Sequence, residues 1–285
     1  MRVDDYLSVG MFQLKVSLDC NSTEEYLIET EEVDRQLEKA FGIIEKQKPD
    51  ISLFPEMTYC KRYETRYRQL SDKRILVAGS YYKEKINTTV VFSNGKKYEI
   101  AKGYASGAEP MARIISYDEP QEFLSKEIKK HEFWVKGKKV YLLNCMEYYH
   151  IAYYLARNEN LKDKLFGIFA ICSNSNTKVF EQETICIHNH NESLYTFVLN
   201  CVGTYKGEDY ADGRSYLYGP VSGHEKEWLR KEKIESKENV SHILSLAKDE
   251  PQYMYGEFLI PERLSRYGRS DQYRNNPRQI KVGKL

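Results

Sequence analysis

The sequence predicts an α/β protein with a single domain. Strand-like and helix-like segments alternate along the chain, and most of the strand segments are apolar on both faces, as in a sheet that helices cover on both sides. Hydrophobic residues make up 41% of the 285 residues, which is enough apolar material for a core. No internal repeat divides the chain, and no linker rich in proline, glycine or serine does so either.

The first elements expected are a strand and a long helix. Residues 11–18 alternate in hydrophobicity, which indicates a strand. Ser22 and Glu25 form a capping-box pattern. Apolar residues then recur at helical spacing at Tyr26, Val33, Leu37, Phe41 and Ile44. We therefore expect one amphipathic helix that begins after this box and ends at Pro49.

The remaining elements continue the alternation. Strands are expected at residues 51–54, 75–82, 88–92, 97–101, 140–144, 165–172, 194–201 and 215–218. Asn94-Gly95 fits the turn of a hairpin between two of these strands. Helices are expected over 147–158 and from the polar cluster 173–177 toward Asn189. The alternating charges of residues 225–237 are typical of an exposed helix.

Composition and charge exclude several classes of protein. No apolar run reaches the roughly 18 residues that a membrane span needs, so we expect no membrane protein. The first residues lack the basic-then-apolar pattern of a signal peptide, which favours a cytoplasmic location and reduced thiols. The net charge of +1 gives no support to a nucleic-acid or membrane partner.

The basic residues are concentrated at the end of the chain. Residues 262–285 carry seven basic and two acidic residues and therefore +5, against −4 on residues 1–261. This basic tail is a solvated segment, a contact with an acidic surface of a subunit, or a nucleic-acid contact. The nucleic-acid hypothesis rests on this basic tail, in which Tyr267 and Tyr273 lie among arginines.

Three polar residues stand at the ends of buried strands, where α/β proteins usually place their sites. Glu56, Lys102 and Cys145 each follow such a strand. A thiol attacks only as a thiolate, so it needs a base or a nearby cation. A carboxylate can take the thiol proton and return it to a leaving amine, and a lysine can stabilise a developing oxyanion. These residue types suffice for acyl transfer without a metal or another cofactor.

Five segments occur in an informative order. They are Phe54-Pro55-Glu56, residues 98–102, residues 143–147, residues 171–177, and residues 198–203 with 212–215 and 219–220. In this order they resemble the nitrilase (carbon–nitrogen hydrolase) superfamily over roughly residues 9–225. The resemblance implies a four-layer αββα sandwich for residues 1–261, with the site between the two sheets.

The resemblance also implies the reaction, which is thiol-dependent hydrolysis of a carbon–nitrogen bond. Glu56 is then the general base, Lys102 the oxyanion-stabilising lysine and Cys145 the nucleophile that forms an acyl-cysteine. An amide is preferred to a nitrile as the substrate because amide cleavage is the commoner chemistry in the superfamily. Residues 147–151 depart from the usual pattern after the nucleophile, and this departure and the basic tail leave a non-catalytic binding or regulatory module as an alternative. An acyltransferase, in which an amine receives the acyl group, is another.

Four further residues are expected to line the substrate site: Glu109, Met146, Glu147 and Asn174. The backbone N–H of Met146 shares the oxyanion hole with Lys102 in the resembled family, and Glu109 is the candidate for a supporting glutamate. The expected partners are a small-molecule amide and a second copy of this chain, because members of the superfamily are usually dimers or larger. Residues 262–285 would then reach the neighbouring subunit.

The other thiols have simpler interpretations. Cys172, Cys186 and Cys201 lie in apolar surroundings and are expected in the core. Cys186 also alternates with His188 and His190, which are metal-ligand types. The segment is predicted to be helical and lacks a second pair of ligands, so we expect no metal site there.

Overall fold

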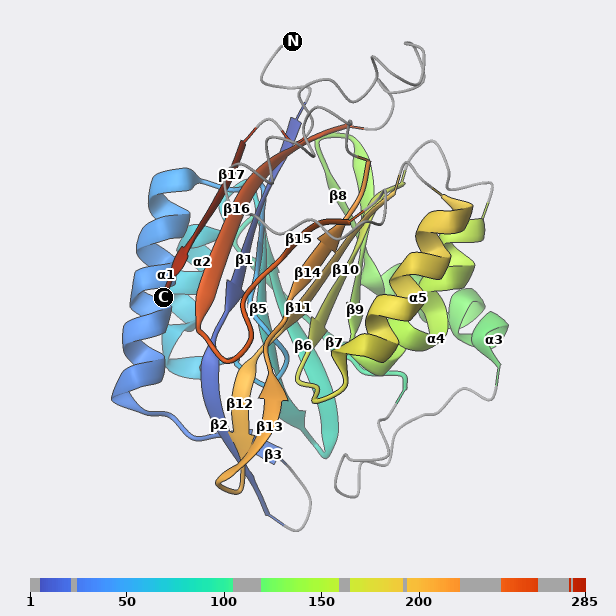
Figure 1. The fold of residues 1–285 in the computed structure, drawn as a ribbon. Helices are drawn as coiled ribbons and strands as arrows, with labels where there is room; N and C mark the ends of the chain where they lie inside the picture. Colours follow the sequence, from blue (N-terminus) through green and yellow to red (C-terminus); the bar gives the residue numbers. More distant parts are fainter. Residues whose placement is uncertain are drawn as a thin grey trace.

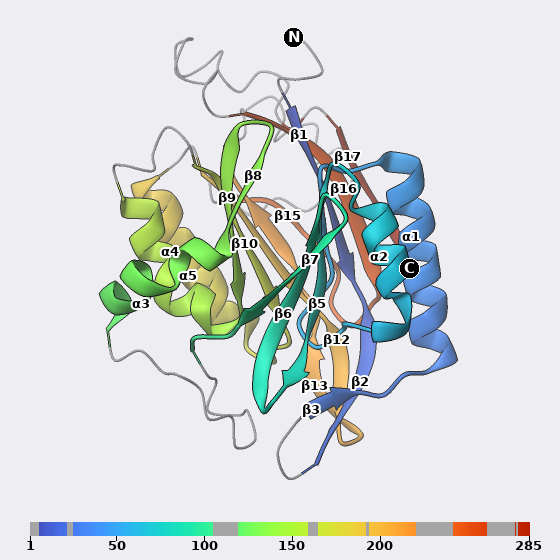
Figure 2. The same cartoon turned by 180° about the vertical axis from the view of Figure 1, so that it is seen from behind.

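The computed structural model describes residues 6–21, 25–104, 119–158, 165–191, 194–220, 242–260, 277 and 279–285. Two sheets lie face to face, with helices on the outer side of each (Figures 1 and 2). This arrangement confirms the predicted α/β class, and its layers are those of an αββα sandwich. Glu109 and residues 225–237 lie outside the described residues.

The first sheet has seven strands, in the order β17-β16-β1-β4-β5-β6-β7. Their bounds are β1 Tyr6–Gln13, β4 Ile51–Leu53, β5 Ile75–Lys83, β6 Ile86–Ser93, β7 Lys96–Ala101, β16 Gln252–Leu259 and β17 Gln279–Lys284. Strands β1, β4 and β5 run parallel, so their carboxyl ends meet at one edge of the sheet. The predicted hairpin between β6 and β7 is present.

The second sheet has six strands, in the order β15-β14-β11-β10-β9-β8. Their bounds are β8 Glu132–Val135, β9 Lys138–Asn144, β10 Leu165–Cys172, β11 Tyr195–Asn200, β14 Tyr216–Tyr218 and β15 His242–Ser245. The central strands β9, β10 and β11 are parallel, and every residue of β10 and β11 is buried. Such continuous burial is expected of parallel strands that are covered on both faces.

A third, small sheet joins the two large ones. It contains β2 Lys15–Cys20, β3 Glu25–Leu27, β12 Val202–Tyr205 and β13 Glu208–Asp212. Strand β2 continues from β1, β12 continues from β11, and the two pair in parallel. The pairing of β2 with β12 therefore connects the two large sheets near the carboxyl ends of their parallel strands.

Among the residues that the structure describes, five α-helices form the outer layers. They are α1 Glu31–Gln47, α2 Glu64–Leu70, α3 Pro120–Lys126, α4 Met146–Arg157 and α5 Thr177–His190. Helices α1 and α2 cover the seven-stranded sheet, whereas α3, α4 and α5 cover the six-stranded one (Figures 1 and 2). The described residues also include two short 3₁₀ turns, Lys61–Tyr63 and Ile128–His131.

In the described part of the chain, three large apolar cores hold these layers, one between the sheets and one under each helical layer. Between the sheets, the rings of Phe169 and Phe197 stack with centroids 4.5 Å apart, and Phe258 meets Phe197 edge-on from the opposite sheet. Aromatic pairs of this kind add to the hydrophobic gain from burial. In the part of the chain described, no helix has the length and apolar character needed to cross a membrane.

Two expectations about the N-terminal segment were wrong. Residues 11–18 are not one strand, because the chain changes sheets at Leu14 between β1 and β2. The long helix begins at Glu31, where the Thr30 side chain caps it by accepting the Val33 N–H at 3.2 Å. Tyr26 lies instead in β3, which pairs with β2. Its helical spacing with Val33 is therefore a coincidence of sequence.

Candidate active site

A sharp turn after β4 presents Glu56 to the space between the sheets. Thr58 Oγ1 donates to the Pro55 carbonyl at 2.6 Å, and the Met57 N–H donates to Ser80 Oγ at 3.0 Å. Gly79 lies against this turn with φ of +96°, and a Cβ there would lie 2.5 Å from the Pro55 oxygen. Only glycine fits this close approach. The neighbouring strand β5 thus fixes the backbone that carries Glu56.

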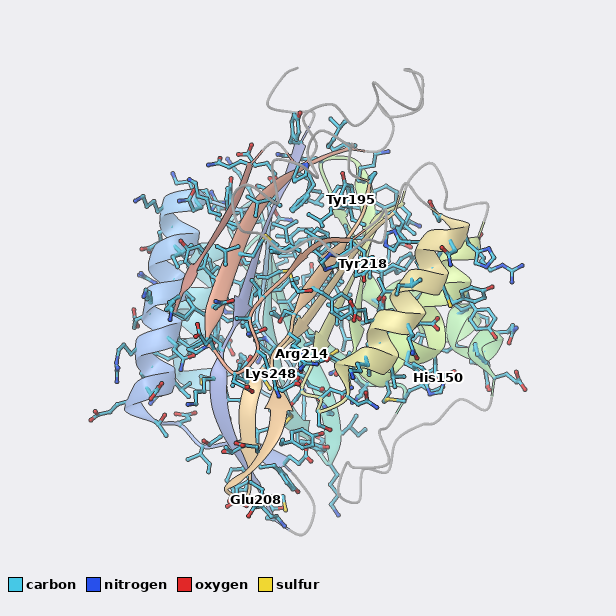
Figure 3. The ribbon with its side chains drawn as sticks, viewed as in Figure 1. His150, Tyr195, Glu208, Arg214, Tyr218 and Lys248 are labelled. Atoms are coloured by element: carbon cyan, nitrogen blue, oxygen red, sulfur yellow. The ribbon has the colours of Figure 1, made fainter. Side chains whose placement is uncertain are left out.

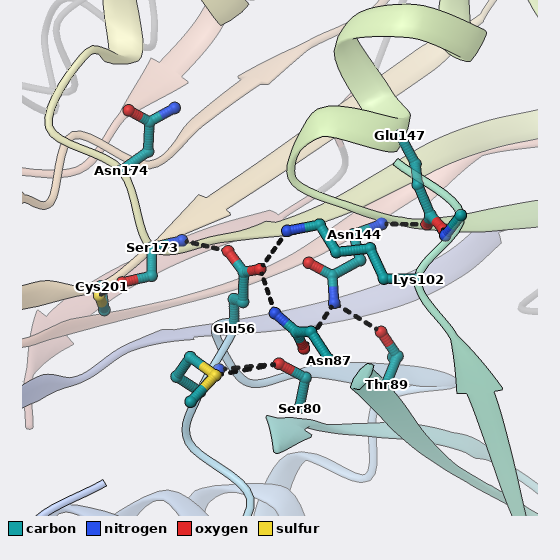
Figure 4. A network of polar contacts seen from close by, with 12 residues as sticks. Glu56, Ser80, Asn87, Thr89, Lys102, Asn144, Glu147, Ser173, Asn174 and Cys201 are labelled. Carbon is teal, nitrogen blue, oxygen red and sulfur yellow. Dashed lines mark hydrogen bonds and ion pairs between the residues drawn. The ribbon is translucent and has the colours of Figure 1, made fainter. Parts of the chain in front are cut away.

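Both oxygens of the Glu56 carboxylate accept hydrogen bonds, and the residue is buried. Oε1 accepts from Asn87 Nδ2 at 2.8 Å and from Lys102 Nζ at 2.9 Å (Figure 4). Oε2 accepts the backbone N–H of Ser173 at 2.9 Å. Donors on three different strands or strand ends therefore orient this carboxylate. Charge-assisted bonds of this kind hold an ionised carboxylate in place.

Lys102 follows β7, and its ammonium is fully enclosed. Its side chain is 0% exposed and pairs with Glu56, which is 4% exposed. Its backbone N–H donates to the Asn87 carbonyl at 2.8 Å, so β6 positions both the lysine and the second donor to Glu56. Burying two charges is costly unless they are paired and hydrogen-bonded, and here they are. A buried pair of this kind is typical of a functional site.

Cys145 lies at the junction of β9 and α4. Its N–H donates to the Ile171 carbonyl of β10 at 2.9 Å, and it occupies the N-cap position of α4 with φ of 46° and ψ of −103°. This backbone conformation is rare for a residue with a Cβ, and such strain clusters at active sites. The first N–H groups of a helix have no intrahelical acceptor and carry partial positive charge. The N–H of Met146, the first residue of α4, therefore suits an oxyanion beside Cys145.

Glu147 links the two strand ends that carry Lys102 and Cys145. Its Oε1 accepts the Gly103 N–H at 2.6 Å, and its Oε2 accepts the Asn144 N–H at 2.8 Å. The residue is 0% exposed. It therefore holds the backbone on which the lysine and the cysteine stand, and both of its oxygens are occupied by these bonds.

The segment after β10 closes another side of the site. The N–H of Asn174 donates to Asn200 Oδ1 at 2.9 Å, and Asn200 Nδ2 donates back to the Asn174 carbonyl at 2.8 Å. The Asn174 side chain is partly exposed, and its Oδ1 accepts the Asn176 N–H. These bonds fix the loop that delivers the Ser173 N–H to Glu56.

Two more thiols lie beside this group. Burial raises the pKa of the Cys172 thiol well above its ordinary value, with further contributions from Cys145 and Glu56. Burial raises the pKa of Cys201 to about 12, and its Sγ contacts Ser173 Oγ at 3.3 Å. Both thiols are buried, as expected for Cys172 and Cys201.

The matched segment 212–215 serves the scaffold. Ser215 Oγ donates to Gln13 Oε1 at 2.7 Å, and Gly213 has φ of +74° with no room for a Cβ beside Gln13. Arg214 and Lys248 both approach Asp212 Oδ2, at 3.5 and 3.9 Å, and lie close together in Figure 3. This segment joins β1 to the second sheet and does not supply a donor to Glu56.

Cys186, His188 and His190 of α5 do not share a site, because they have different exposure and different partners. Cys186 is exposed, so its expected place in the core was wrong, because position 186 falls on the outer face of α5. His188 is buried with Nε2 3.0 Å from Thr196 Oγ1, whereas His190 Nε2 lies 3.0 Å from the Tyr153 hydroxyl. His150 of α4 also lies in the outer helical layer (Figure 3). Among the described residues, no three histidine, cysteine or carboxylate side chains are grouped for a metal ion.

Sequence reasoning missed three contributors to the site. In the sequence, Asn87 is only a polar residue near the start of an apolar strand. Ser173 contributes through its backbone N–H, which the identity of its side chain does not indicate. The third is Tyr210 of β13: burial raises its pKa, and Glu56 and Cys145 raise it further. Its placement depends on the pairing of β12 with β2, which no local pattern predicts.

Comparisons with known proteins were made at the level of sequence and of structure. No family model matches this chain, and no curated protein sequence does. An amidase from Nesterenkonia sp. superposes with a TM-score of 0.60 at 14% identity, over 91% of this chain and 92% of its own. A mutant of the Nesterenkonia AN1 amidase, described as a member of the nitrilase superfamily, gives 0.59 at 14% identity over 94% and 96%.

Other similar structures share the same architecture. A CN-hydrolase superfamily protein from Xanthomonas campestris gives a TM-score of 0.56 at 10% identity, over 88% of this chain and 90% of its own. The NitFhit protein of C. elegans gives 0.56 at 12% identity, over 90% of this chain and 61% of its own. Likeness at these identities is a likeness of fold.

Proposed function

We propose that this chain, which has the fold of the nitrilase superfamily, is a carbon–nitrogen hydrolase that cleaves a small amide through Glu56, Lys102 and Cys145. The observation that carries the proposal is the buried Glu56–Lys102 pair, at 2.9 Å. Its carboxylate accepts the Ser173 N–H directly after β10, the strand that pairs with the strand before Cys145. The comparisons support the proposal, because the structures similar to this chain include an amidase and a CN-hydrolase superfamily protein.

The first half of the reaction forms the acyl-enzyme. Glu56 takes the proton of the Cys145 thiol, and Sγ attacks the amide carbon as the carbonyl electron pair moves to oxygen. Lys102 and the Met146 N–H stabilise the resulting oxyanion. Oε2 of Glu56 accepts one donor, Ser173, whereas Oε1 accepts two, so Oε2 has the freer lone pair for the thiol proton.

The second half releases both products. Glu56 gives its proton to the leaving nitrogen, the C–N bond breaks, and the amine or ammonia departs. A water molecule then attacks the acyl-cysteine while Glu56 takes its proton, and the C–S bond breaks to give a carboxylic acid. If an amine attacked instead of water, the same residues would perform acyl transfer.

A panel of small aliphatic and aromatic amides tests the proposal. Release of ammonia and of the acid should be lost in Cys145→Ala and lowered by about 10²–10⁴ in Glu56→Gln, which cannot accept the thiol proton. Cys201→Ser serves as the matched control, because it changes another buried thiol of the same region and should retain turnover. EDTA should not lower the rate. Turnover that survives in Cys145→Ala, or that zinc restores after chelation, would contradict the proposal.

A further inference from the structure

Two cysteine side chains meet at the candidate active site, and the proposed reaction uses only one of them. Strands β9 and β10 are parallel with Asn144 opposite Ile171. Cys145 and Cys172 are the next residue on each strand, and the Cys145 N–H bonds the Ile171 carbonyl at 2.9 Å. Burial raises the pKa of the Cys172 thiol, and the neighbouring Cys145 raises it further. They are 4% and 2% exposed.

The separation of the two strands suits a covalent link. Neighbouring strands lie about 4.8 Å apart. This spacing falls within the Cα separation of about 4.4–6.8 Å that a disulfide needs. The two positions directly follow the paired residues Asn144 and Ile171, so they are neighbours at the ends of adjacent strands. No large movement of the backbone is therefore required to join the sulfurs.

We propose that Cys145 and Cys172 form a reversible disulfide when the protein meets a hydroperoxide. Cys172 then acts as the resolving thiol, and the nucleophile is protected from irreversible oxidation while it is inactive. The proposal rests on the nucleophilic Cys145 of the proposed function, but it does not depend on the identity of the substrate.

The chemistry balances in two steps. The Cys145 thiolate attacks one peroxide oxygen, an S–O bond forms, the O–O bond breaks and hydroxide (or the alkoxide) leaves, so Cys145 becomes a sulfenic acid. Glu56, which already accepts the N–H of the next residue, Ser173, then takes the Cys172 proton as the Cys172 sulfur attacks the Cys145 sulfur. An S–S bond forms and the S–O bond breaks. The Cys172 proton leaves with the hydroxyl group as water. The peroxide takes up the two electrons that the two sulfurs lose.

The neighbouring thiol provides a discriminating control. Cys201 is also buried beside the site, but its Sγ contacts Ser173 Oγ at 3.3 Å. If proximity alone selected the resolving thiol, Cys201 would compete. The pairing of Asn144 with Ile171 makes Cys145 and Cys172 neighbours on adjacent strands, which predicts that Cys172 reacts instead.

The test is hydrogen peroxide treatment of the full chain, followed by blocking of free thiols and peptide mapping without reductant. The wild type should give a linked peptide pair, Cys145 with Cys172, that is lighter by two hydrogens, and dithiothreitol should restore both thiols. The same should hold for Cys201→Ser. In Cys172→Ala, Cys145 should proceed to sulfinic acid, which dithiothreitol does not reverse.

Three results would overturn the inference: linkage of Cys145 to Cys201, sulfinic acid at Cys145 in the wild type as readily as in Cys172→Ala, or an unmodified Cys145 while exposed Cys186 is oxidised. The folding of each variant is checked by circular dichroism. Because the readout is a mass and not a turnover, failure of this inference is distinguishable from failure of the amide-hydrolase proposal.

Discussion

The side-chain amide of Asn87 donates to Oε1 of Glu56 at 2.8 Å, so strand β6 holds the carboxylate that follows strand β4. Asn87→Leu removes this donor and keeps a similar volume. A hydrogen bond to a charged group contributes about 1.5–3 kcal/mol, so we expect amide turnover to fall by about 10–100-fold. Thr89→Val is the control, because Thr89 bonds Asn144 and not Glu56. Equal rates in Asn87→Leu and wild type would show that Glu56 needs no such support.

Glu147 is predicted to be a positioning residue that holds the backbone next to Lys102 and Cys145. Glu147→Gln turns one acceptor into a donor that faces the N–H of Gly103 or Asn144. An unsatisfied buried donor costs about 1–3 kcal/mol, so the urea midpoint should fall. Displacement of Lys102 and Cys145 should also lower turnover by about tenfold or more. Glu183→Gln, at a half-buried position of α5, is the control and should change neither the urea midpoint nor the turnover. If Glu147→Gln also changed neither, Glu147 would not be a positioning residue.

Stability should fall in mildly acidic solution because of His188. Burial lowers the pKa of this histidine to about 3 in the folded protein, whereas about 6.5 is usual in an unfolded chain. Below pH 6.5 the unfolded state therefore takes up a proton that the folded state does not. The free energy of unfolding should decrease as the pH falls from 6.5 toward 3, by up to about 1.4 kcal/mol per pH unit.

Urea unfolding between pH 7 and pH 5 measures this dependence before most carboxylates titrate. His188→Gln should flatten the decrease, because glutamine has no proton to gain, whereas His190→Gln on the exposed face should retain it. A slope that is unchanged in His188→Gln would assign the acid sensitivity to other groups.

The end of the chain is predicted to stabilise the fold of its own subunit. Residues 279–284 form β17, which pairs antiparallel with β16 at the edge of the first sheet, and Ile280 is buried. Removing residues 279–285 exposes the hydrogen-bonding edge of β16 and the apolar surface beneath Ile280. The shortened chain should therefore unfold at lower urea. An unchanged midpoint would show that β17 contributes nothing to stability.

We also propose that the chain is a homodimer or a larger homo-oligomer. Light scattering on the full chain measures this, and a monomeric mass would contradict it. Because β17 belongs to the sheet, deletion of residues 262–285 changes stability as well as any subunit contact. Lys281→Gln and Lys284→Gln remove charges that are exposed on β17 but keep the strand. A lower oligomeric mass in these variants would therefore report a subunit contact and not a loss of stability.

Much of the fold follows from hydrophobic periodicity, and the errors have physical causes. The strands before Glu56, Lys102 and Cys145 were predictable because their residues are apolar and end in a polar residue. The start of α1 was not, because Ser22 and Glu25 imitate a capping box while Thr30, followed by Glu31 and Glu32, is the true N-terminus. Both segments have the sequence of a helix N-cap, and local sequence alone does not show which one is used. The choice depends on tertiary structure, because residues 25–27 pair with β2 as a strand and the helix can begin only after them.

The site was predictable only where side-chain chemistry marks it. A carboxylate, a lysine and a thiol at strand ends are visible in sequence. The Asn87 amide and the Ser173 N–H are not, because their role depends on how β6 and the β10–α5 loop approach Glu56. The contact between Cys145 and Cys172 likewise depends on strand register.

The structure also identifies a competing thiol. Hydrogen bonds from the Tyr205 and Lys206 side chains lower the pKa of Cys20, which is partly exposed. Simple alkylation would therefore label Cys20 as well as a reactive Cys145. A test of the nucleophile must use an acyl donor that depends on the oxyanion hole, in a Cys20→Ser background.

Trapping of the acyl-enzyme tests the central claim most directly. The Cys20→Ser chain is mixed with a small activated ester, quenched in acid within the first turnovers and mapped by mass spectrometry. We predict one acyl group per chain on the Cys145 peptide, absent from Cys145→Ala and formed much more slowly in Glu56→Gln. An unacylated Cys145, or an acyl group on Cys60, Cys172, Cys186 or Cys201 in its place, would contradict the proposal that Cys145 is the nucleophile.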